Sequence, residues 1–128
     1  MNAPFAPIMD TSSGRMVEFL SSRTIDNLPP AVISQARIRL LDTLGCGLYG
    51  GMTPWSRIAA EVVYEEQSQG RATIYGHRNP VAPARAALVN GTAAHGMELD
   101  DIAPPGTTHP GSVVVPAVLA TAQQFELP

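Results

Sequence analysis

The sequence has a single cysteine, Cys46, among its 128 residues. A lone cysteine cannot close a disulfide within the chain, so a reducing environment is expected, and we predict a cytoplasmic location. The cysteine and the three histidines form no cluster at zinc-ligand spacing. We therefore expect no metal site.

Strong positive charge and long apolar runs are also missing. The formal net charge is −3 and no basic patch occurs, which argues against nucleic acid as a partner. No apolar run approaches the roughly 18 residues that a membrane-spanning helix needs. The first residues lack the basic and long apolar segments of a secretory signal. We expect no membrane partner.

Hydrophobic residues nevertheless make up 45% of the chain, enough to bury one modest core. In most segments they recur at helical spacing, and prolines stand where helices can begin. The predicted helices run over a short stretch after Thr11 that includes Met16–Leu20, then Pro30–Tyr49, Pro54–Glu66, Pro83–Asp101 and Pro110–Phe125. Ala72–Tyr75 is predicted to be an edge strand or an extended piece.

These segments predict an all-α bundle of about five helices with at most one short strand. Residues 1–14 are expected to form a flexible arm. The small residues of the fourth predicted helix fit the middle of a bundle, and the nearly continuous apolar run from Val113 to Leu119 predicts a last helix buried on all sides. Such apolar helices need a covering surface, so the chain looks incomplete by itself.

The stretch from Asn90 to Gly111 gathers most of the polar chemistry. Glu98, Asp100 and Asp101 stand at the predicted C-terminus of the fourth helix, where the helix dipole disfavours each exposed carboxylate by roughly 0.3–1 kcal/mol. This cost predicts a functional role for at least one aspartate, against the alternative of a solvated helix end. His109 and Pro110 then begin the next helix, whose free N–H groups would favour a substrate carboxylate.

Several blocks of the chain together resemble the amino-terminal part of the MmgE/PrpD family, which includes 2-methylcitrate dehydratase, cis-aconitate decarboxylase and iminodisuccinate epimerase. The blocks are Arg37–Gly47, Gly76–Pro83, Ala87–Gly91 with His95, the pair Asp100–Asp101, and His109–Pro110. The resemblance implies that residues 15–128 are an incomplete N-terminal helical domain. The smaller α+β domain that family chains also carry is absent here.

The resemblance also implies a cofactor-free lyase, a dehydratase or decarboxylase of small di- and tricarboxylic acids. It implies a homo-oligomer, or a hetero-oligomer with a chain that carries the C-terminal domain. Such chemistry makes or breaks a bond next to a carboxylate, and so needs a base, an acid and anion stabilisation. An epimerase of the same family and a non-catalytic assembly subunit remain as alternatives.

His109 is the candidate acid/base, with Asp100 and Asp101 orienting it and the substrate; the plain alternative for His109 is a helix-capping loop residue. The candidate substrate-binding residues are Thr107, Thr108, His95 and Glu98. His95 and Glu98 are three positions apart and would share a helix face, although a buried, hydrogen-bonded core histidine is the simpler role for His95. Glu98 departs from the family pattern, which leads us to expect Asp in decarboxylase-like members.

Overall fold

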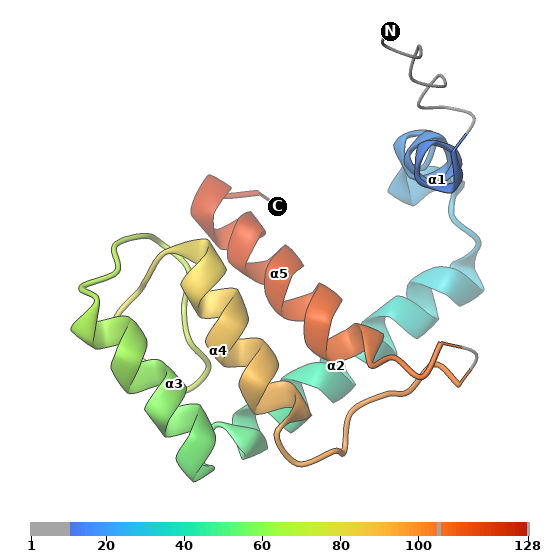
Figure 1. The fold of residues 1–128 in the computed structure, drawn as a ribbon. Coiled ribbons are helices and arrows are strands. Elements are labelled where there is room, and N and C mark those ends of the chain that lie inside the picture. The colour runs from blue at the N-terminus through green and yellow to red at the C-terminus, as the bar shows by residue number, and fades with distance from the viewer. Residues whose placement is uncertain (1–10, 105, 128) are drawn as a thin grey trace, which may run out of the picture. The chain divides into compact units, whose positions relative to one another are not determined.

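The computed structural model describes residues 11–104 and 106–127. These residues form five α-helices and one short 3-10 helix and contain no strand (Figure 1), so the predicted all-α class is confirmed. The elements are α1 (Ser12–Ser21), η2 (Ile25–Asn27), α2 (Pro30–Gly50), α3 (Pro54–Glu65), α4 (Pro83–His95) and α5 (Pro110–Phe125). None of these helices has both the length and the apolar character needed to cross a membrane.

Two compact units divide the chain after Ala36. In the first, Thr11 caps α1 by accepting a hydrogen bond from the Gly14 amide at 3.0 Å. Residues 1–10 of the predicted flexible arm lie outside the described residues. The last residues of that predicted arm, from Ser12 on, are helical.

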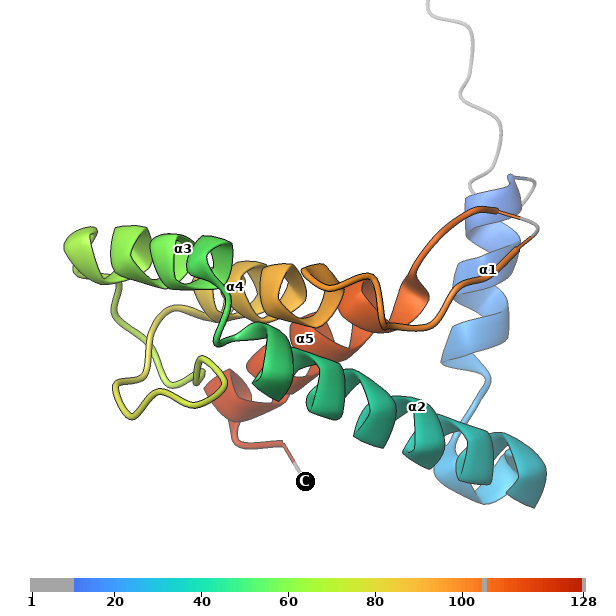
Figure 2. The same cartoon turned by 90° about the horizontal axis from the view of Figure 1, so that it is seen from below.

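The second unit holds the core and the candidate site. Figures 1 and 2 show α4 running between α3 and α5, and α4 packs against both. The buried side chains are small or β-branched, as the predicted central position of this helix requires. They include Ala60 and Val63 of α3, Ala86, Val89 and Ala93 of α4, and Ala120 of α5.

A close backbone approach joins α2 to α4. A Cβ added at Gly50, the last residue of α2, would lie 2.9 Å from the carbonyl carbon of Ala93 and overlap its oxygen. Only glycine fits such an approach. This contact fixes the C-terminal turn of α4, which carries His95.

The segment between α3 and α4 is extended but pairs only once. Ala72 and Val81 form an isolated antiparallel bridge. Of the two predicted alternatives for Ala72–Tyr75, an edge strand or an extended piece, the structure shows the extended piece. The buried Asn90 side chain of α4 accepts from the Tyr75 amide at 2.8 Å and donates to the Thr73 carbonyl at 2.9 Å. These two bonds tie the segment to α4.

Two details of the prediction were wrong. The fourth helix ends at His95, with Gly96 as its C-cap, and not at Asp101. α5 has the predicted bounds but is not buried on all sides, because it meets α4 through a narrow face of small residues. Its outward valines remain accessible, and Val113 is 71% exposed.

Candidate active site

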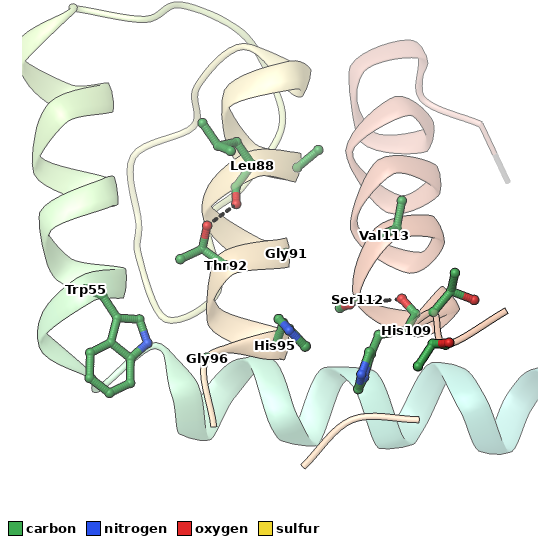
Figure 3. A pocket seen from close by; sticks show the side chains of 12 residues that line it. Trp55, Leu88, Gly91, Thr92, His95, Gly96, His109, Ser112 and Val113 are labelled. Carbon is green, nitrogen blue, oxygen red and sulfur yellow. Dashed lines mark hydrogen bonds between the residues drawn. The ribbon is translucent and has the colours of Figure 1, made fainter. Parts of the chain in front are cut away.

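A pocket of about 750 Å³ lies at the junction of α4 and α5, with Trp55 of α3 at its side (Figure 3). The volume is in the range of sites that take small organic ligands. Trp55, Leu88 and Val113 supply apolar walls. The polar lining consists of His95, His109, Thr92, Thr107, Thr108 and Ser112.

His95 and His109 come from different helices but meet at this pocket. His95 is the last residue of α4 and His109 immediately precedes α5. Their ring centroids are 4.5 Å apart and the ring planes are inclined by 62°, and Figure 3 shows the two side chains approaching each other. The structure thus brings two imidazole side chains together at one pocket.

Asp100 lies behind the two imidazoles, and its side chain is 0% exposed. Its carboxylate oxygens are 3.1 Å from Nδ1 of His95 and 3.4 Å from Nδ1 of His109. Burial alone would raise the pKa of Asp100, but hydrogen bonds with His95, Ser112 and the backbone outweigh burial and hold this pKa below its ordinary value. A buried, ionised carboxylate therefore faces both rings.

Asp101 points elsewhere, although it is the next residue. Its Oδ1 accepts a hydrogen bond from the Gly111 amide at 2.8 Å, in the first turn of α5. His109 occupies the N-cap position, but its side chain makes no capping hydrogen bond. The Asp101 carboxylate caps the helix instead, although it precedes the N-cap in the chain. The Gly111 amide, which we expected to be free for a substrate carboxylate, is occupied by a carboxylate of the chain itself.

The helix-dipole argument for the aspartates is consequently wrong. α4 ends before Asp100 and Asp101, so neither carboxylate lies at its negative end. Asp101 instead lies at the favourable, positive end of α5. The structure does bring Asp100 close to His95 and His109. The loop between α4 and α5 places it there, and the dipole of α4 has no part in this arrangement.

The remaining predicted residues lie around the rim. Glu98 is exposed, and its Oε1 lies 3.2 Å from Nε2 of His95. The two residues do not share a helix face as predicted, because α4 ends at His95 and Glu98 has a left-handed backbone conformation. Thr107 and Thr108 line the pocket, and the Thr108 carbonyl accepts a hydrogen bond from the Ala103 amide at 2.8 Å, which closes the loop. Neither Glu98, Asp100 nor Asp101 lines the pocket directly.

Sequence reasoning missed Trp55, Leu88, Ser112 and Val113 as pocket residues. In the structure Trp55 packs against Gly96, where an added Cβ would lie 3.2 Å from the indole Cδ1, and no pattern in the sequence indicates this contact. None of the lining residues is an arginine, and the sequence has no lysine. Among the lining residues that the structure describes, the two imidazoles are therefore the only basic side chains.

The MmgE/PrpD N-terminal domain model matches residues 14–127 of this chain. The chain belongs to the MmgE/PrpD family. It is 35% identical over 100 residues to human cis-aconitate decarboxylase, covering 77% of this chain and 21% of the relative. It is 34% identical over 97 residues to the cis-aconitate decarboxylase-like protein oryM of Aspergillus oryzae, covering 76% and 20%.

The cis-aconitate decarboxylase of Aspergillus terreus is more distant, at 26% identity over 111 residues, 87% of this chain and 23% of the relative. The chain thus spans about a fifth of the length of these curated relatives. The predicted family is confirmed.

Proposed function

We propose that this chain supplies the proton-transfer part of a cofactor-free lyase that decarboxylates or dehydrates small di- and tricarboxylic acids. It acts as an N-terminal segment or split subunit, together with the part of the fold that the relatives carry beyond it. The observation that carries the proposal is the Asp100 carboxylate, fully buried between the Nδ1 atoms of two imidazoles that line one pocket.

His109 is the acid/base group in this proposal. Asp100 orients the ring, because its buried carboxylate lies 3.4 Å from Nδ1 of His109. Nε2 of the same ring is then the atom that exchanges a proton with the substrate. His95, held between Asp100 and Glu98, binds a substrate carboxylate or carries the second proton.

Both lyase reactions fit these groups. In decarboxylation the C–C bond to a carboxylate breaks, CO₂ leaves, the electron pair stays on the remaining carbon, and a protonated imidazole protonates it. In dehydration a neutral imidazole removes a proton next to a carboxylate, and the hydroxyl leaves as water after it accepts a proton from an imidazolium. Each role for an imidazole is worth about 10²- to 10⁴-fold in rate.

The rim residues complete the proposed site. The hydroxyls of Thr107 and Thr108 bind a substrate carboxylate, with Ser112 beside them. Asp101 positions His109, because its bond to the Gly111 amide fixes the residue two places after the imidazole. Two of the relatives named above are cis-aconitate decarboxylases, so cis-aconitate is the first substrate to test.

The test measures CO₂ release from cis-aconitate by the chain alone and with the products of neighbouring reading frames. In the active assembly, His109→Ala is expected to lower kcat by about 10²- to 10⁴-fold. His77→Ala is the matched control, because His77 is exposed, lies beside Tyr64 and does not line the pocket. Near-normal turnover of His109→Ala would remove this residue from the mechanism.

Epimerisation needs the same proton removal next to a carboxylate but no leaving group, so a panel of chiral acids distinguishes it from lyase activity. A non-catalytic assembly role is favoured by a different observation, the exposed apolar side chains of α4 and α5. These are Leu88, Val113, Val114 and Val118. Light scattering of the purified chain, with and without a neighbouring gene product, tests for a homo- or hetero-oligomer; a monomeric, active chain would exclude the assembly role.

A further inference from the structure

We propose that His95, Asp100 and His109 form a binding site for one divalent transition-metal ion of the zinc type. Each residue offers one ligand atom, and these atoms all lie within 4.8 Å of one another. The sequence led us to expect no metal site. The inference concerns binding only and does not depend on the proposed lyase activity.

The ligand separations are close to those of a tetrahedral zinc site. Metal–ligand bonds of about 2.0–2.1 Å at tetrahedral angles place ligand atoms about 3.4 Å apart. Asp100 oxygens are 3.1 Å from Nδ1 of His95 and 3.4 Å from Nδ1 of His109. The widest separation in the set, up to 4.8 Å, closes to the tetrahedral distance when the two rings move together by roughly 1.5 Å.

The surroundings hold the ligands as metal sites require. A histidine that binds a metal through one ring nitrogen usually directs its other nitrogen to a carboxylate, which fixes the ring and strengthens the ligand. Glu98 fills this role for His95, at 3.2 Å from Nε2. The Asp100 side chain is fully buried, so its carboxylate faces the ion without competition from bulk water.

The donor set selects the kind of ion. Two imidazole nitrogens and one carboxylate oxygen suit Zn²⁺ and its first-row neighbours, whereas Mg²⁺ and Ca²⁺ require oxygen ligands. Three protein ligands leave a fourth position, as in zinc sites that bind water or a substrate. Because His95 and His109 both line the pocket, this position opens toward it.

Sequence spacing concealed the site because its ligands come from the end of α4, the following loop and the start of α5. An ion bound here would occupy the same Nδ1 atoms that face Asp100.

The test is a Zn²⁺ titration of the untagged chain, followed by the imidazole Cε1–H resonances in NMR spectra. The chain has three histidines, so each spectrum contains its own control. His95 and His109 are expected to shift together and saturate at one equivalent of Zn²⁺, while His77, which lies beside Tyr64, does not shift. Mg²⁺ at the same concentration is expected to shift none of them.

Asp100→Asn keeps the shape of the third ligand but removes its charge, and it is expected to weaken Zn²⁺ binding at least 10-fold. His77→Gln is the matched control and is expected to bind as wild type does. Three outcomes would overturn the site: no shift of His95 and His109 in excess Zn²⁺, an equal shift of all three histidines, or unchanged affinity of Asp100→Asn. If the wild-type chain binds no Zn²⁺ and His109→Ala still loses turnover, the metal site is rejected and the proposed lyase is not.

Discussion

Two glycines of α2 should respond to alanine in opposite ways. Gly45 lies within the helix and has no atom within 4 Å of an added Cβ. Replacing a helical glycine by alanine in open space stabilises a protein by about 0.5–1 kcal/mol, because alanine loses less backbone entropy on folding. Gly45→Ala is therefore expected to raise the free energy of unfolding by this amount.

Gly50→Ala is expected to do the reverse. The added Cβ would lie 2.9 Å from the carbonyl carbon of Ala93, where carbon atoms in contact are normally about 3.5–4.0 Å apart. The backbones of α2 and α4 must then separate by up to roughly 1 Å, and overpacking of this kind costs about 1–3 kcal/mol. The two variants should differ in unfolding free energy by about 1.5–4 kcal/mol.

Urea-induced unfolding, followed by far-UV circular dichroism, measures both variants on the same scale. The close approach also predicts an effect at the site, because Ala93 lies two residues before His95. The Cε1–H resonance of His95 is expected to shift in Gly50→Ala and to stay in place in Gly45→Ala. Wild-type stability of Gly50→Ala, or a larger loss in Gly45→Ala, would refute the close packing of α2 on α4.

Three further substitutions test single contacts in denaturant unfolding. Asn90→Ala should cost about 2–4 kcal/mol, because it leaves the buried Thr73 carbonyl and Tyr75 amide without their partner; a loss below 1 kcal/mol would contradict this role. Tyr75→Phe should be neutral or slightly stabilising at pH 7, because the hydroxyl is buried without a hydrogen-bond partner among the described residues. Burial raises the pKa of Tyr75 in the folded state, so wild type should lose stability as the pH rises from about 10 through that pKa, and Tyr75→Phe should lose less. Asp101→Ala should cost about 1 kcal/mol by removing the acceptor of the Gly111 amide, and amide exchange at Gly111 should accelerate if this bond is the cause.

Most of the helices could be predicted because local signals mark their ends. Thr11 caps α1, and Pro30, Pro54, Pro83 and Pro110 each begin a helix in the structure. The C-terminus of α4 could not be predicted in the same way. The residues after His95 are compatible with a helix, and Gly96 alone is a weak stop signal. The indole of Trp55, packed against Gly96, is a tertiary contact that no local pattern reveals.

The same limit applies to the candidate site. Histidines and aspartates within a short stretch could be recognised as a cluster, and the structure places His95, Asp100 and His109 together. Their order in the sequence could not show that Asp100 faces both imidazoles, since this depends on where α4 ends and on how the loop returns. Trp55 and Leu88 belong to other parts of the helical unit, so their place in the pocket is a property of packing.

The contrast between Asp100 and Asp101 shows why neighbours with identical side chains are not interchangeable. The loop bends at Asp100, and the two neighbouring carboxylates have different partners: only that of Asp100 lies beside the imidazoles. The other reaches forward to the Gly111 amide at 2.8 Å and thereby closes the loop that carries His109 back toward Asp100. The contact of 3.4 Å between Asp100 and His109 therefore depends on Asp101, although Asp101 does not line the pocket. Asp100 therefore faces the two imidazoles, while Asp101 is bonded to the first turn of α5.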